Sequence, residues 1–250
     1  MQIPHHILAL YGTGADVSSI QRGYDNNKTY QRPVLPTHDR VLRDLQSWEK
    51  AQDYLGKEAH YPDFLRFFQR EMDTRGGWEP VVAEYLFRED DAADDMLVRL
   101  FSGFLHPLIQ LMYGMEWRQP SIVAEALAQA AVHGNDIGIY LLEAERLAKV
   151  SSEDDDDSVP PPSIVNLFQA VHDDEKLAGA AKMSDANKVR DGVLVRAREE
   201  ILRIASRVRV RPDELEERTA EMFNACVYMA SSAAMTMHPP KQPKFDFFLM

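Results

Sequence analysis

Five polar or aromatic side chains share one stretch of largely apolar sequence: His106, Gln110, Tyr113, Glu116 and Trp117. If this stretch is helical, Gln110 and Tyr113 follow His106 by one and two turns, so the three can lie on one face. Burial among apolar neighbours favours the neutral imidazole, which can act as a general base or a hydrogen-bond partner. We predict that His106 and Tyr113 are catalytic, and that the other three line a pocket for a flat aromatic molecule.

The same residues are also compatible with an ordinary core helix. In that interpretation a backbone carbonyl satisfies the imidazole, and Tyr113 and Trp117 only fill core volume. Pro107 adds one expectation, because a residue that precedes proline favours extended backbone geometry. We therefore expect His106 to be the last non-helical residue before a helix, with its ring facing a cavity.

Two adjacent histidines, His5 and His6, are the other candidates for imidazole chemistry. Neighbouring residues of a helix point about 100° apart, so both rings cannot face the same site. We expect one of the two rings to be exposed.

Carboxylates and histidines build metal sites in helical proteins, and Glu116, Glu125 and His133 are the residues to test for this. The sequence contains no Glu-x-x-His pattern. Glu125 lies opposite its apolar neighbours and is expected to face solvent, and His133 is rotated from it by about 80° on an ideal helix. We assign no metal ligands.

The segment Gly12-Thr13-Gly14 matches the start of a dinucleotide fingerprint, but it follows a helical pattern and lacks the third glycine. No cofactor-binding residue is therefore predicted. The single cysteine, Cys226, excludes an internal disulfide and is expected to be a buried apolar residue of a helix.

Composition restricts the class of protein. The chain has 250 residues and a formal charge of −12, which repels phosphate backbones, so no nucleic-acid partner is expected. No segment approaches the length of a membrane span, and the N-terminus lacks the positive region of a signal peptide. We predict a cytoplasmic protein that does not bind membranes.

Helical periodicity dominates and predicts an all-α fold, a multi-helix orthogonal bundle. Strand patterns are nearly absent. The expected helices begin near Asp39 and then cover these ranges: 61–75, 78–87, 101–117, 120–133, 137–150, 164–171, 185–207 and 212–235.

An acidic and proline-rich segment divides the chain, because its four aspartates and three consecutive prolines cannot bury an apolar face. We predict a helical domain at 1–150, a loop at 151–162 and a second helical part at 163–250 that packs on the first. The aromatic-rich end at 245–250 would begin another buried helix. We therefore expect an incomplete part of a larger helical fold, whose exposed end self-associates.

Several segments together resemble the fungal questin oxidase-like family, in order along nearly the whole chain. The segments are His5-His6-Ile7-Leu8-Ala9-Leu10-Tyr11, Tyr24-Asp25-Asn26-Asn27 with Tyr30-Gln31-Arg32-Pro33, Tyr61-Pro62-Asp63-Phe64-Leu65, Gly103-Phe104-Leu105-His106-Pro107-Leu108-Ile109 with its continuation to Ala128, and Phe245-Asp246-Phe247-Phe248-Leu249-Met250.

The resemblance implies an NADPH-dependent, monooxygenase-like oxidoreductase of secondary metabolism, including mycotoxin biosynthesis. The implied reaction is a Baeyer–Villiger-type ring cleavage, and the implied partner is a small aromatic polyketide of the anthraquinone or xanthone type. The family pattern also favours His6 as the inward histidine of its pair, so it is the third predicted catalytic residue. Whether a flavin or a metal activates oxygen is left open.

One position departs from the family pattern. The family commonly has a second histidine four residues after His106, where this chain has Gln110. An amide cannot shuttle a proton near neutral pH. The alternative interpretation is therefore a non-catalytic helical module that binds a small aromatic ligand or a partner chain.

Overall fold

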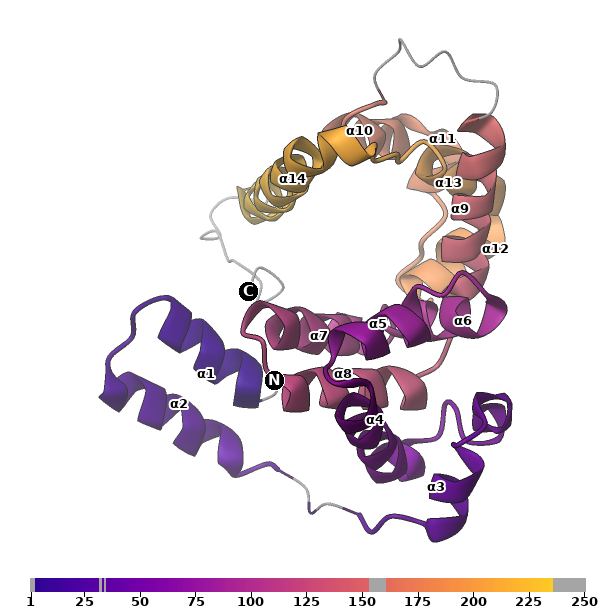
Figure 1. The fold of residues 1–250 in the computed structure, drawn as a ribbon. Helices are drawn as coiled ribbons and strands as arrows, with labels where there is room; N and C mark the ends of the chain where they lie inside the picture. Colours follow the sequence, from indigo (N-terminus) through magenta and orange to yellow (C-terminus); the bar gives the residue numbers. More distant parts are fainter. Residues whose placement is uncertain (1–2, 32, 34, 153–160, 236–250) are drawn as a thin grey trace. The chain divides into compact units, whose positions relative to one another are not determined.

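The computed structural model describes residues 3–31, 33, 35–152 and 161–235, and every regular element within these ranges is helical (Figure 1). The all-α prediction is confirmed for this part of the chain. The chain divides into two compact units, Met1–Ile139 and Tyr140–Met250, which are described separately. Helix α9 (Gly138–Ser152), expected at the end of the first domain, lies almost entirely in the second unit.

The first unit begins with α1 (Ile3–Gly12) and α2 (Val17–Lys28), which pack against each other. The elements that follow are α3 (Asp39–Asp44), the 3-10 turns η1 (Trp48–Asp53) and η2 (Glu58–His60), α4 (Tyr61–Arg75), α5 (Glu79–Leu86), α6 (Asp91–Arg99), η3 (Gly103–Leu105), α7 (His106–Glu116) and α8 (Pro120–Val132). The expected ends of α4 are confirmed, because Pro62 occupies its first turn and Gly76 closes it with a left-handed φ of 79°.

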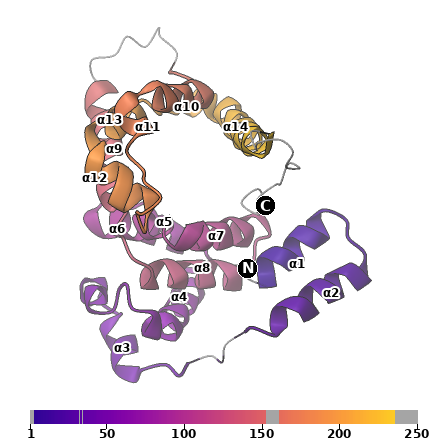
Figure 2. The same ribbon diagram turned by 180° about the vertical axis from the view of Figure 1, so that it is seen from behind.

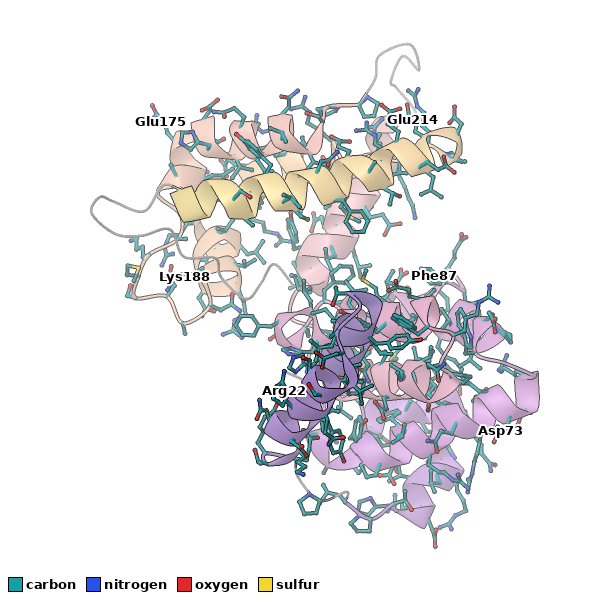
Figure 3. All side chains as sticks on the ribbon, turned by 90° about the vertical axis from the view of Figure 1, so that its left-hand side faces the viewer. Arg22, Asp73, Phe87, Glu175, Lys188 and Glu214 are labelled. Atoms are coloured by element: carbon teal, nitrogen blue, oxygen red, sulfur yellow. The ribbon has the colours of Figure 1, made fainter. Side chains whose placement is uncertain are left out.

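Helix α8 is the most buried helix of the first unit and contacts both α4 and α7 (Figure 2). Its alanines allow a close approach, and Gly114 of α7 has the same effect from the other side. A Cβ atom at Gly114 would lie 2.8 Å from the backbone nitrogen of Val123. A cluster of aromatic side chains packs beside these helices and comprises Trp48, Phe64, Phe67, Phe68 and Tyr85. Exposed charged residues, such as Arg22 and Asp73, cover the outside (Figure 3).

The helix predicted for 101–117 begins later than expected. Gly103, Phe104 and Leu105 have φ angles of 57°, 57° and 63°, so a left-handed turn precedes α7. Such angles are rare for residues other than glycine and cost free energy at Phe104 and Leu105. Helix α7 therefore starts at His106, directly after this turn.

We expect Gly103→Ala to lower the free energy of unfolding by about 3 kcal/mol in a urea titration followed by circular dichroism. The added Cβ would meet Nε2 of His133 at 2.3 Å, in addition to the strain of a positive φ. Gly14→Ala is the matched control, because its φ is 78° and nothing lies within 4 Å of the added atom. Equal losses in the two variants would contradict the predicted collision.

The second unit contains α9, α10 (Ile164–Asp173), α11 (Glu175–Ala178), the π-turn η4 (Lys188–Val193), α12 (Leu194–Arg196), α13 (Arg198–Ala205), the 3-10 turn η5 (Pro212–Glu214) and α14 (Leu215–Met235). Its small core comprises Leu167, Leu177, Ala180, Ala197 and Ile204. The acidic run at 153–157 and the C-terminal segment 236–250 lie outside the described residues, so the loop and self-association predictions stay untested there.

The single long helix predicted for 185–207 is wrong, because the helical conformation starts only at Lys188, as a π-turn, and is interrupted at Ala197. Asn187 caps the π-turn by accepting hydrogen bonds from the amides of Val189 and Arg190. Ala197, at φ −144°, then separates α12 from α13. The prediction of a buried cysteine is also wrong, since Cys226 is exposed on α14.

Within the described ranges, no single helix has the length and apolar character needed to cross a membrane. Helix α6 and the segment Gly103–Glu116 meet the same criteria of length and composition only as a pair bent by 70°.

Candidate active site

His5 of α1 meets the predicted catalytic face of α7. Its side chain is only 8% exposed, and its ring stacks on that of Tyr113 with a centroid distance of 5.2 Å and an interplanar angle of 17°. The side chains of Gln110 and His106 lie close enough to influence the protonation of His5. The structure therefore brings three of the predicted α7 residues together with a histidine from another helix.

Two polar atoms in this group have no partner at normal hydrogen-bond distance among the described residues, although the Gln110 side chain lies near enough to His5 to act as a weak partner and raise its pKa. They are Nε2 of His5 and Oε1 of Gln110, and both are buried. Nearly all buried polar atoms in folded proteins are hydrogen bonded, so an exception calls for a physical reason. A ligand or a water molecule that bonds to both atoms would supply one.

Burial lowers the pKa of His5 from 6.5 to about 4, because an apolar environment disfavours the charged ring. The neighbouring Gln110 amide acts in the opposite direction, and positive charge on His106 would lower the pKa further. His5 is therefore neutral near pH 7. A neutral imidazole in this position can accept a proton or a hydrogen bond.

Gln110 connects this group to α8 and α4. It is completely buried, and its Nε2 donates a hydrogen bond to Oε2 of Glu125 at 2.6 Å. Burial raises the pKa of Glu125, and burial together with the nearby Glu125 raises the pKa of Tyr61. The expectation that Glu125 faces solvent is wrong, because α7 covers that side of α8.

His106 is the first residue of α7 and has helical angles, φ −57° and ψ −42°. The expected extended geometry is therefore wrong, because His106 adopts the α region, which a following proline disfavours but does not forbid. Nδ1 of His106 lies 2.6 Å from the carbonyl oxygen of Gly103. A carbonyl only accepts hydrogen bonds, so Nδ1 carries the proton and the neutral ring offers its Nε2 as an acceptor.

Contacts between two loops position this histidine. Arg99, paired with Asp95 at 2.8 Å, donates to the carbonyl oxygen of His133 at 2.5 Å. The hydroxyl of Ser102 donates to the carbonyl oxygen of Gly134 at 2.6 Å. These bonds connect the segment before α7 to the end of α8 and thereby fix the start of α7.

His6 points to a different side of α1 from His5, as the helical geometry requires. Its Nδ1 lies 2.7 Å from Nδ2 of Asn27, an amide that also donates to the carbonyl oxygen of Gly23. The expectation that His6 is the inward histidine is wrong for the α7 side, because His5 faces α7 and is the more buried ring. The hydroxyl of Tyr30 donates to Asn27 in turn. His6 therefore contributes to holding α1 on α2.

The remaining predicted pocket residues lie at the far end of α7. Glu116 is exposed in the last turn. Trp117 caps the helix and packs edge-on against Tyr11, with a centroid distance of 5.5 Å. The structure does not bring these two residues to the polar group around His5 and Gln110.

The structure also shows where the residues that were considered for cofactor and metal binding lie. Gly12 to Gly14 form the turn that ends α1, in which the amides of Thr13 and Gly14 donate to carbonyl oxygens of that helix. No strand precedes this turn, so it does not fit dinucleotide binding. Glu116, Glu125 and His133 do not converge as a ligand set among the described residues.

A cavity of about 560 Å³ opens elsewhere on the first unit. Trp48, Leu55, Arg88, Asp91, Asp95 and Arg99 are among its lining residues. None of the six predicted site residues lines this cavity.

Comparison with known proteins decides the family. The model of the family described as questin oxidase-like matches residues 2–250. This chain belongs to the questin oxidase-like family. It is 40% identical over 250 residues to a questin oxidase of Aspergillus fumigatus, covering 98% of this chain and 55% of that protein. It is 38% identical over 251 residues to the Baeyer–Villiger oxidase ptaJ of Pestalotiopsis fici, covering 99% of this chain and 54% of that protein.

A third relative is the Baeyer–Villiger oxidase AgnL3 of Paecilomyces divaricatus, 38% identical over 254 residues. The chain spans about half the length of the curated relatives that it matches. The resemblance inferred from the ordered sequence segments is thus confirmed at the level of the family.

The structure of this questin oxidase-like chain adds three residues that the sequence analysis did not assign to the site: His5 as the buried histidine, Glu125 and Tyr61. The pairing of Gln110 with Glu125 joins two helices and has no fixed spacing in sequence. The apolar pattern of α8 gave no indication of it, because this pattern predicts that Glu125 faces solvent, whereas nearly every neighbouring position of α8 is buried.

Proposed function

We propose that the complete protein inserts oxygen next to a ring carbonyl of an aromatic polyketide, a Baeyer–Villiger-type oxidation. Of the two oxygen atoms of O₂, one enters a carbon–carbon bond and the other leaves as water, with two electrons from NADPH. NADPH is proposed from the family resemblance alone. The described residues offer no dinucleotide-binding fold, so the steps below involve only the side chains of this chain.

One observation carries the proposed role of this part of the protein. Nε2 of His5 and Oε1 of Gln110 are buried next to the ring of Tyr113, and neither makes a hydrogen bond of normal length to the described residues. A phenol or quinone carries hydroxyl and carbonyl groups on a flat ring. A hydroxyl group can donate a hydrogen bond to such an acceptor, a carbonyl group can accept one from such a donor, and the ring can stack on an aromatic side chain. We propose that this group binds the oxygen substituents of the substrate.

Two imidazoles are available in this proposal, one for proton transfer and one for hydrogen bonding, although Gln110 replaces the second family histidine. His5 is neutral because of burial, and His106 presents its Nε2 because Nδ1 is bonded to Gly103. His106 can take a phenolic proton from the substrate, which would make the ring more electron-rich toward oxygen. His5 is too weak a base for this step, because its pKa is lowered to about 4, and it serves as a hydrogen-bond partner. The second imidazole comes from α1 rather than from the next turn of α7.

We expect His106→Ala to lower turnover of an anthraquinone by the full-length protein by about 100-fold or more, measured as oxygen- and NADPH-dependent product formation. His172→Ala is the control, because His172 is an exposed histidine of α10 that bonds to its neighbour Asp173. Circular dichroism would verify the fold of both variants. Unchanged turnover in His106→Ala would remove this residue from the mechanism.

The same assay addresses the alternative of a non-catalytic module. Tight binding of the quinone by the full-length protein without oxygen consumption would favour the module. If His5→Phe then lost quinone binding, the quinone would still be located at the group of His5, Gln110 and Tyr113.

A further inference from the structure

Two histidines and one aspartate that lie outside the candidate active site come together where α4 begins. They are His38, His60 and Asp63, and one potential ligand atom from each lies within 4.8 Å of the others. Nδ1 of His38 and Nδ1 of His60 lie 2.9 Å and 3.0 Å from the same carboxylate oxygen, Oδ2 of Asp63. We propose that these three residues bind a divalent transition-metal ion of the zinc class.

The local sequence explains the convergence. His60 is the residue before α4, and Asp63 lies in its first turn, three positions later, so both project from the same end of the helix. His38 is the residue before α3 and reaches Asp63 from a distant part of the sequence. Its backbone amide also donates to Oδ1 of Asp63 at 2.6 Å, which fixes the orientation of the carboxylate.

The geometry fits ligation. Two atoms held at about 2.1 Å from one ion lie about 3.0 Å apart when they subtend a right angle, and at most about 4.2 Å apart. Both nitrogen–oxygen distances already have the shorter value. The third separation, between a nitrogen of His38 and a nitrogen of His60, lies within 4.8 Å. A rotation of the His38 ring, whose side chain is half exposed, would bring these nitrogens into range of one ion.

The chemistry of the donors also selects the ion. Two imidazole nitrogens and one carboxylate suit zinc, iron(II), cobalt(II) and similar ions, whereas calcium and magnesium prefer oxygen ligands alone. Asp63 is fully buried, so its charge is not dispersed by water. The exposed side of His38 provides an entry path and room for water as a further ligand.

Without an ion, each imidazole can donate its Nδ1 proton to Asp63. On binding, each Nδ1 becomes a ligand, so the neutral ring must carry its proton on Nε2 instead. The ion changes no oxidation state in this proposal. It would connect the segment before α3 to the start of α4.

Further groups support the site from outside. Tyr54 packs edge-on against the ring of His60, with a centroid distance of 5.0 Å, and its hydroxyl donates to Asp44 at 2.6 Å. The rings of His38 and His60 pack edge-on, with a centroid distance of 5.6 Å and an interplanar angle of 72°. Aromatic packing on one ring and partial exposure of the other give one fixed and one adjustable ligand.

The test is calorimetric titration of the chelator-treated 250-residue chain with zinc chloride, repeated with cobalt chloride while visible absorption is recorded. We expect one equivalent to bind the wild type and the cobalt complex to absorb in the visible range. His38→Ala and His60→Ala should each weaken binding by about 100-fold or more, since loss of even an outer-sphere partner costs 10–100-fold.

His172→Ala is the matched control, because His172 also lies beside a carboxylate, that of Asp173 at 3.1 Å, but on the surface. The affinity of the His172→Ala variant for zinc should equal that of the wild type. His38→Ala is the safer of the two variants for the fold, and circular dichroism would compare its helicity with that of the wild type.

Two results would overturn the proposal. If the wild type binds no ion above the background of a denatured sample, the three residues form only a hydrogen-bonded group. If both variants retain full stoichiometry and affinity, the ion binds to other residues. Both readouts are independent of catalytic turnover.

Discussion

Replacing Gln110 by alanine is expected to lower the free energy of unfolding of the 250-residue chain by about 3 kcal/mol. The Gln110 side chain is completely buried, so the variant would leave a cavity between α7 and α8. It would also remove the donor that lies 2.6 Å from Glu125. A half-buried carboxylate without this partner is costly. Chemical denaturation at neutral pH measures the difference.

Two further variants separate the causes. Gln110→Met keeps nearly the same volume and loses only the hydrogen bond, so we expect a smaller loss of about 1 kcal/mol. Gln21→Ala is the control on the surface of α2, where Nε2 of Gln21 also bonds to a carboxylate, that of Asp25 at 3.2 Å. Its effect should stay within about 0.5 kcal/mol. A similar loss for Gln21 and Gln110 would show that burial of Gln110 has been overestimated.

Acidification should destabilise the folded chain through His5. The pKa of His5 is lowered from 6.5 to about 4 in the folded state, mainly by burial. Between these values the unfolded chain binds a proton that the folded chain does not, so stability falls as the pH falls. Above pH 6.5 this contribution is complete and constant. From about pH 7.5 to about pH 5, the expected loss is about 2 kcal/mol.

The His5→Phe variant isolates this effect. A phenyl ring can keep the stacking on Tyr113 but has no proton to bind, so its stability should depend less on pH by the same amount. Glu125 has a raised pKa and acts in the opposite direction, but it is present in both proteins and largely cancels in the comparison. Equal pH dependence of the wild type and His5→Phe would contradict the prediction. Titration of the His5 ring by nuclear magnetic resonance gives the pKa directly.

Local signals in the sequence were sufficient for most helices. The proline in the first turn of α4, Gly76 at its end and the alanine-rich pattern of α8 set their boundaries through backbone geometry alone. The same signals failed at Gly103 to Leu105 and at Ala197. At Gly103 the imidazole of His133, a residue far away in sequence, lies beside the backbone. At Ala197 the backbone leaves the helix with φ −144° and ψ 40°, and no sequence signal marks the position.

The candidate site likewise combines features that the sequence predicted with features that only the tertiary fold decided. The spacing of His106, Gln110 and Tyr113 predicted one shared face of α7. From this face Gln110 contacts α8 and Tyr113 contacts α1. Periodicity could not decide between His5 and His6, because that choice depends on which side of α1 meets α7. The tertiary fold made His5 the buried ring and assigned His6 to Asn27.

By itself, the sequence determined the helical class, the family and the face of α7 that carries the polar residues. These follow from patterns that repeat within a few residues or match in order along the chain. Only the tertiary structure brought His5 to Gln110, turned Glu125 toward α7 and joined His38 to the start of α4. Such contacts join residues far apart in sequence, and the packing of whole helices, not local spacing, decides which of them meet.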